Sequence, residues 1–359
     1  MSAPQVEIQL VAALAAAACA LPGAFLVLRR MSLLSDAISH SILLGIVLAF
    51  LVVGAAIVGV ATVVCVELLR RTELVREDAA IGLVFPALFS LGVVLIARFA
   101  DSVHLDTDAV LLGELAFAPF DRLVIGGYDI GPQALYVMGA ILAVNVVALA
   151  AFYKELKLST FDPALAMALG FAPGLVHYGL MTLVSVTAVG AFNAVGAILV
   201  VALMIAPPAT AYLLTDRLSL LLAGSAAIGV AAAISGYWLA HTLDASIAGS
   251  MATAAGALFT LAFLFAPDRG FVAGARRRAR QRWEFPQSTL AIHLLNHEGR
   301  PEAATESRVE HLDEHLRWDP RFADEVVARA ERRGIVVRDD GRLALTERGR
   351  AVARRALAR

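Results

Sequence analysis

The stretch from Met31 to Phe50, MSLLSDAISHSILLGIVLAF, decides how the rest of the chain is interpreted. It is apolar enough to form a membrane helix, yet it contains Asp36 and His40, which lie one helical turn apart and project from the same face. Ionisable residues are costly at membrane depth and usually face a protein interior or a polar pathway. A carboxylate with an imidazole is a ligand pair for Mn²⁺, Fe²⁺ or Zn²⁺, so the pair predicts a metal pathway. The alternative is a polar pair that hydrogen-bonds a neighbouring helix.

The composition is that of a membrane protein with a charged tail. Of the 359 residues, 59% are hydrophobic and 17% are charged, and the mean hydropathy is +0.74. Twenty of the 30 Lys and Arg residues lie at or beyond Arg269. We therefore predict a transmembrane domain at 1–267, a basic linker at 268–285 and a small cytoplasmic domain at 286–359.

Nine apolar segments are long enough, or nearly so, to cross a hydrocarbon core of about 30 Å at about 1.5 Å per residue. Lipid offers no hydrogen-bond partners, so these segments must be helices. The predicted fold class is an all-α polytopic membrane protein with a small cytoplasmic winged-helix α+β domain. The N-terminus lacks a basic signal-peptide region, so the first segment is interpreted as a retained span. The predicted segments are 6–28, 33–53, 55–70, 79–98, 131–152, 173–191, 194–214, 218–240 and 247–266.

Basic residues in the loops predict the orientation. After even-numbered segments the loops contain only Arg98 and Arg122, which places the N-terminus outside and the C-terminus in the cytoplasm. The outer loop at 99–130 is either a metal-gathering mouth or an ordinary solvated loop, and its candidate ligands are His104, Asp106, Asp108 and Glu114. The basic residues after odd-numbered segments are Arg29, Arg30, Arg70, Arg71, Arg76, Lys154, Lys157, Arg217 and Arg269.

A short cytoplasmic helix is predicted between the fifth and sixth segments, in STFDPALAMALGFAP (159–173). Asp162 has the position of an N-cap, Pro163 that of a first helical residue, and Gly170 that of a C-terminal stop. The helix would be too short to span the membrane. Its apolar surface indicates a docking site for a cytoplasmic partner, unless the helix lies on the underside of the bundle. That surface consists of Ala164, Leu165, Met167, Ala168 and Leu169.

The seventh segment, AVGAILVVALMIAPPATAYLL (194–214), combines small residues with Pro207 and Pro208. Small residues allow close helix approach, and a double proline frees backbone carbonyls, so we expect a helix break inside the bundle. Asn193, just before this segment, either supplies an amide oxygen to a metal or caps the helix.

A winged-helix order of elements is predicted from Pro286 onward. The mixed charges of its third helix do not favour DNA binding, and the basic run at 276–282 favours anionic membrane lipid over nucleic acid. The expected helices are 287–297, 306–316, 321–333 and one starting at Thr346, with a hairpin of Ile335–Arg338 and Arg342–Leu345.

Two histidine pairs in this domain share helical faces at a spacing that can hold a metal. A regulatory metal site is one interpretation, and ordinary surface histidines are the other. The residues concerned are His293, His297, Glu310, His311, Glu314 and His315.

The chain has no motif for hydrolysing ATP. A P-loop needs a lysine after glycine, and the two lysines, Lys154 and Lys157, follow other residues. The two cysteines, Cys19 and Cys65, exclude CxxC and a disulfide framework. We therefore predict a transport subunit that is not an enzyme, driven either by a separate ATPase or by an ion gradient.

These segments together resemble the membrane permease subunit of ABC importers for manganese, zinc and iron(II). MSLLSDAISHSILLGIVLAF, STFDPALAMALGF, AVGAILVVALMIAPPATAYLL and the span after HTLDASIAGS carry the resemblance, which covers most of residues 7–266. It implies a homo- or heterodimer of permeases in the bacterial cytoplasmic membrane, two cytoplasmic ABC ATPase subunits and an extracytoplasmic metal-binding protein. It also implies that Asp36 and His40 line the metal pathway and that Pro163–Leu169 is the coupling helix. The metal is cargo, and no permanent cofactor is implied.

The tail resembles the winged-helix and metal-sensing region of metal-dependent repressors. Two functions other than an ABC permease stay open. One is an ion-coupled secondary metal transporter, although Glu67 is among the few other charges inside the segments. The other is a membrane-tethered regulator that senses metal and binds DNA through residues 286–359.

Overall fold

The structure is a computed structural model. The chain divides into two compact units, Met1–Gly270 and Phe271–Arg359. The described residues are 3–31, 37, 61–62, 64–69, 72, 79–80, 82–84, 86–88, 90–91, 94, 115–126, 128–301, 307–309, 312, 316–339 and 341–358.

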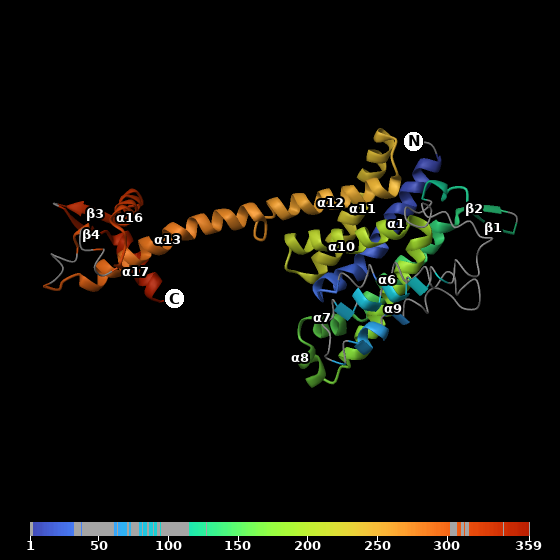
Figure 1. Cartoon of the computed structure of the whole chain (residues 1–359), viewed down its shortest axis with the longest axis horizontal. Coiled ribbons are helices and arrows are strands. Elements are labelled where there is room, and N and C mark those ends of the chain that lie inside the picture. The colour runs from blue at the N-terminus through green and yellow to red at the C-terminus, as the bar shows by residue number, and fades with distance from the viewer. Residues whose placement is uncertain are drawn as a thin grey trace. The chain divides into compact units, whose positions relative to one another are not determined.

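In its described part, the first unit contains six helices that are long and apolar enough to cross a membrane. They match the first and the fifth to ninth predicted segments. The second, third and fourth predicted segments fall largely outside the described residues. The six helices, labelled in Figure 1, are α1 (Ala3–Leu28), α6 (Gln133–Ala151), α9 (Pro173–Val195), α10 (Ala197–Leu214), α11 (Leu218–Leu243) and α12 (Ile247–Phe265).

Helix α1 is the central helix among them. It packs against α6, α9, α10 and α11, and many of its buried residues are alanines. Small side chains let neighbouring backbones approach closely, which is how helices associate where lipid removes the hydrophobic driving force.

Helices α1 and α10 approach each other closely at Gly23. A Cβ atom on Gly23 would collide with the backbone carbonyl of Met204. Pro208 has no N–H to donate to that carbonyl, which is four residues before it in α10. Pro207 and Pro208 are buried, but α10 continues through both, so the expected break is wrong. Helix α10 packs against α1, α11 and α12. Such packing lets a membrane helix continue through prolines, which have no backbone N–H to donate.

A buried polar network ties α6 to α1 and α9. Asn145 Nδ2 donates to the carbonyl oxygen of Ala18 and to Thr187 Oγ1, both at 2.9 Å. Asn145 and Thr187 are fully buried. Buried amide groups of this kind hold membrane helices in register, because in hydrocarbon they have no water to bond instead.

A β-hairpin that the sequence analysis did not predict lies beside the N-terminal end of α1 (Figure 1). It consists of β1 (Arg122–Ile125) and β2 (Tyr128–Pro132), paired antiparallel, and a 3₁₀ turn (Leu115–Phe117) precedes it. Arg122 forms ion pairs with Asp129 inside the hairpin and with Glu7 of α1, the latter at 3.4 Å. At the opposite end of α1 lie α7 (Tyr153–Phe161) and α8 (Pro163–Ala168).

The second unit begins with the long helix α13 (Phe271–His297). The predicted basic linker at 268–285 is therefore mostly helical, and the helix predicted at 287–297 starts sixteen residues earlier, at Phe271. Alanine and arginine are strong helix formers, and they outweigh the boundary that Pro286 suggested. The unit continues with α16 (Pro320–Arg332), β3 (Val336–Asp339), β4 (Arg342–Leu345) and α17 (Glu347–Leu357).

The hairpin and the two helices beside it confirm the predicted order of elements in residues 316–358, although the assignment to the winged-helix fold stays a prediction. β3 and β4 pair antiparallel, and Arg308 forms a bridge to Arg342. This unit has its own core, which includes Leu290, Val326 and Leu343.

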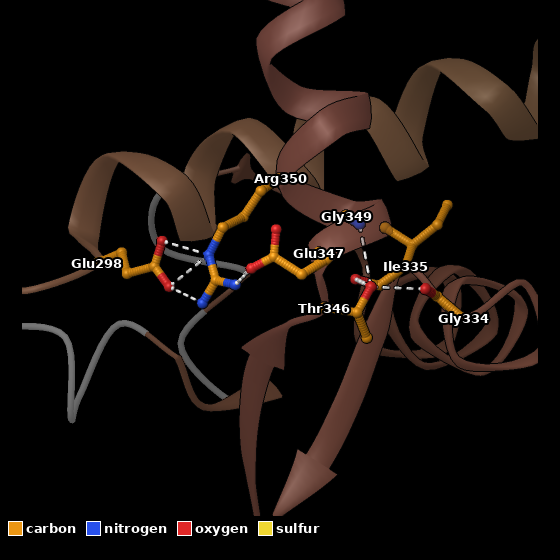
Figure 2. Close-up of polar contacts among 7 residues, drawn as sticks. All are labelled: Glu298, Gly334, Ile335, Thr346, Glu347, Gly349 and Arg350. Carbon is orange, nitrogen blue, oxygen red and sulfur yellow. Dashed lines mark hydrogen bonds and ion pairs between the residues drawn. The ribbon is translucent and has the colours of Figure 1, made fainter.

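Polar contacts join α17 to the rest of this unit (Figure 2). Arg350 bonds Glu298 at 2.6 Å and Glu347 at 2.6 Å. Thr346 caps α17 by accepting from the N–H of Gly349 at 3.0 Å, and its hydroxyl lies 2.6 Å from the Gly334 carbonyl oxygen. Nearby, the Arg329 guanidinium lies 3.6 Å from the centre of the Trp283 ring.

Candidate functional site

Helix α8 forms as its capping signals predict. The Asp162 carboxylate accepts from the N–H of Leu165 at 2.9 Å, and Pro163 occupies the first turn. The C-terminus ends at Gly170, whose φ of +84° favours glycine. The N–H of Phe171 donates back to Ala166 at 3.0 Å. The helix is one residue shorter than predicted.

The apolar surface of α8 is uncovered. Leu165, Met167 and Leu169 are 45%, 61% and 59% exposed, whereas Ala166 is fully buried and faces the unit's interior. Within the described part of the chain the bundle does not cover these three side chains, which favours a docking surface over a helix that lies on the underside of the bundle. Exposed apolar side chains gathered on one short helix are typical of a docking surface for another protein.

Arg29, directly after α1, joins the two elements on either side of α8. Its Nε donates to Thr160 Oγ1 and its Nη2 to Ser159 Oγ, each at 3.1 Å, at the end of α7. Its Nη1 donates to His177 Nδ1 at 3.1 Å, in the first turns of α9. Arginine has only donors, so the imidazole accepts and carries no proton on Nδ1. Partial burial lowers the pKa of Arg29, because desolvation disfavours its charged form.

These side chains surround a pocket of about 360 Å³ between the end of α1 and the α7–α8 corner. Its other lining residues are Leu28, Arg30, Met31 and Pro163. The sequence analysis treated Arg29 only as a marker of orientation and missed Ser159, Thr160 and His177. Ser159 lies 130 positions and His177 lies 148 positions after Arg29 in the sequence, so no local signal could have revealed these hydrogen bonds.

The predicted metal ligands Asp36 and His40 lie outside the described residues. Ala37, between them, is described and buried. Their segment follows the end of α1 directly, since Met31 comes two residues after Arg29. The outer-loop candidates from His104 to Glu114 also lie outside the described part.

Asn193 is placed inside α9 and is exposed. The N-cap of α10 is Gly196, with φ +79° and no side-chain bond, so the predicted capping role of Asn193 is wrong. Helix α9 runs on past the boundary drawn at residue 191, and the turn to α10 needs the left-handed backbone that glycine supplies. A metal-binding role for Asn193 stays a prediction.

In the second unit, His293 and His297 lie side by side on α13, with ring centroids 4.7 Å apart. His293 is buried, so it is not the ordinary surface histidine of the alternative interpretation. Among the described residues, no group of three or more His, Cys, Asp or Glu is arranged to hold a metal. The other predicted regulatory residues, Glu310, His311, Glu314 and His315, lie outside the described part.

A sequence model of the ABC 3 transport family matches residues 6–266, which contain α8 and the six apolar helices apart from the first three residues of α1. The chain belongs to this family. It is 49% identical over 357 residues to the zinc transport system membrane protein TroD of Treponema pallidum, and the aligned region covers 97% of each chain. It is 47% identical over 264 residues to the manganese transport system membrane protein MntD of Bacillus subtilis, covering 71% of this chain and 89% of that one.

A solved structure shares the fold. The chain is similar to PsaBC from Streptococcus pneumoniae in complex with Fab, with a TM-score of 0.64 and 27% identity over 75% of this chain and 94% of that chain. Family membership together with six apolar helices indicates a multi-pass inner-membrane protein and a transport permease.

Proposed function

We propose that the chain is the permease subunit of an ABC importer that moves a divalent transition metal, Mn, Zn or Fe, into the cytoplasm. The observation that carries this is the family match over residues 6–266, with relatives named for zinc and manganese transport. A separate ATPase subunit supplies the energy. An ABC family also favours ATP over an ion gradient as the driving force.

The uncovered surface of α8 is the docking site for that ATPase. Lys154 and Lys157 on α7 are exposed beside it, which supports a cytoplasmic position for this end of the bundle. The β1–β2 hairpin and the N-terminus then lie outside, and the second unit is cytoplasmic. An extracytoplasmic metal-binding protein and a second permease subunit complete the importer.

Asp36 and His40 are the residues proposed to hold the ion during passage. Their carboxylate and imidazole suit all three metals, so this pair does not select among them. Asn193 is a third, weaker candidate because amide oxygens bind such ions less strongly than carboxylates do. The His293–His297 pair stays the core of the proposed regulatory metal site in the second unit, and the Arg-rich start of α13 suits anionic lipid.

The test is metal accumulation in cells that express the permease, its ATPase and its binding protein. Asp36→Ala and His40→Ala should each abolish accumulation while the variant chains still reach the membrane and retain the ATPase. Ser235→Ala, on the exposed surface of α11, is the matched control and should accumulate metal normally. Normal accumulation by Asp36→Ala or His40→Ala would contradict the proposed pathway.

A further inference from the structure

The end of α1 is held in a fixed geometry. The N–H of Arg30 donates to the Val27 carbonyl at 3.1 Å, and the N–H of Met31 donates to the Leu26 carbonyl at 2.9 Å. Arg30 has a φ of +61°, the left-handed conformation that completes this type of helix cap and that residues other than glycine rarely adopt. The position of Arg29 therefore determines where the following segment, 31–50, begins.

The Arg29 side chain connects that point to both flanks of α8. Ser159 and Thr160 precede the N-cap Asp162 by two or three residues, and His177 follows α8 by nine residues, in the first turns of α9. Within the described residues α8 itself packs on α7 and, less extensively, on α9. A displacement of α8 must therefore move the acceptors of Arg29.

We propose that Arg29 is the positioning residue that transmits the movement of α8 to the end of α1, after which the chain continues toward Asp36 and His40. This inference rests on the proposed function, in which α8 docks into the ATPase. The three acceptors lie on two elements, and only a planar fork of donors reaches all of them, so a lysine ammonium cannot replace the guanidinium.

The pocket around Arg29 is better explained by this connection than by a bound anion. Each of the three guanidinium nitrogens already donates to a protein acceptor, which leaves two of its five N–H groups. Ser159 is buried and also lies within hydrogen-bond distance of the Leu156 carbonyl, at 3.3 Å. Among the described residues the acceptors of Arg29 are neutral, which lets the bonds break and re-form without separating an ion pair.

The experiment uses the complete importer of permease, ATPase and binding protein in proteoliposomes. Arg29→Lys keeps the charge but removes the fork, and Ser159→Ala combined with Thr160→Ala removes two acceptors while keeping Arg29. Ser235→Ala, an exposed change on α11 away from these contacts, is the control. ATPase retention, ATP hydrolysis and metal transported are measured on the same preparations.

We expect both Arg29→Lys and the double hydroxyl variant to retain the ATPase and to hydrolyse ATP. The metal moved per ATP should fall by about tenfold, which is within the range of fold-changes that couplings between two sites typically produce. Ser235→Ala should match the wild type. An unchanged ratio in the double hydroxyl variant would overturn the proposal, and so would loss of the ATPase, because that would assign Arg29 to docking.

A failure of the proposed docking role of α8 can be distinguished from a failure of the Arg29 proposal. If Met167→Ala combined with Leu169→Ala leaves ATPase binding unchanged, α8 is not the docking helix, whatever the Arg29 variants do. If that pair releases the ATPase while the Arg29 variants transport normally, only the transmission role is wrong.

Discussion

Truncating the exposed apolar side chains of α8 tests the docking surface quantitatively. In Met167→Ala combined with Leu169→Ala, the two side chains lost are 61% and 59% exposed. Fully burying a Leu or Met side chain contributes about 1.5–3 kcal/mol, so covering the exposed parts of both contributes roughly 2–4 kcal/mol. The alanine methyl groups retain some of this, and a loss of roughly 1.5–3 kcal/mol weakens ATPase binding by about 10- to 150-fold.

The assay is a titration of purified ATPase subunit onto the permease in lipid nanodiscs. Leu243→Ala is the matched control, because Leu243 is 65% exposed and lies at the last residue of α11. It should bind the ATPase as the wild type does. The docking assignment would be refuted if the α8 double variant kept wild-type affinity, or if Leu243→Ala weakened binding as strongly.

Three further changes probe the two folded units. Gly23→Ala forces a Cβ into the α10 backbone and should destabilise the permease by about 1–3 kcal/mol in thermal unfolding, whereas Gly256→Ala, which has open space around it, should not. Asn145→Ala removes the bonds to α1 and α9 and should cost about 1–2 kcal/mol in the same assay. The hydrogen bond from Arg350 lowers the pKa of Glu298 in the folded protein. The pair should therefore stabilise the second unit fully above about pH 4.3, the usual pKa of Glu. This stabilisation should be lost as the pH falls through the lowered pKa of Glu298 in the folded protein.

The acid dependence is measured by tryptophan fluorescence. Two of the three tryptophans, Trp283 and Trp318, lie in the second unit, and Trp238→Phe removes the signal from α11. Glu298→Gln should lower the unfolding temperature at neutral pH and make no difference in strong acid. Equal effects at both pH values would contradict the assigned pair. For Gly23→Ala and Asn145→Ala, unfolding temperatures equal to that of Gly256→Ala would contradict the packing argument.

Local signals were sufficient for α8 and for the apolar helices. The cap, the first-turn proline and the terminal glycine of α8 all lie within nine residues from Asp162 to Gly170, so the chain specifies this helix without reference to distant parts. Long apolar runs are equally local, because the bilayer sets their length.

The remaining features depend on tertiary packing or on competing local preferences. The partners of Arg29 come from α7 and α9, and only the assembled bundle brings them together. Asn193 lies in a helix because α9 extends beyond the predicted boundary, and the turn uses Gly196 instead. The continuation of α10 through its two prolines likewise depends on neighbouring helices, which no single segment reveals.

Both lysines of the chain lie on α7, three residues apart and exposed, directly before α8. Apart from the N-terminal amine, an amine-reactive fluorophore would therefore attach only at this corner of the permease. A dye placed there would lie next to the bound ATPase and would report its arrival and departure during turnover, without any cysteine having to be engineered into the chain.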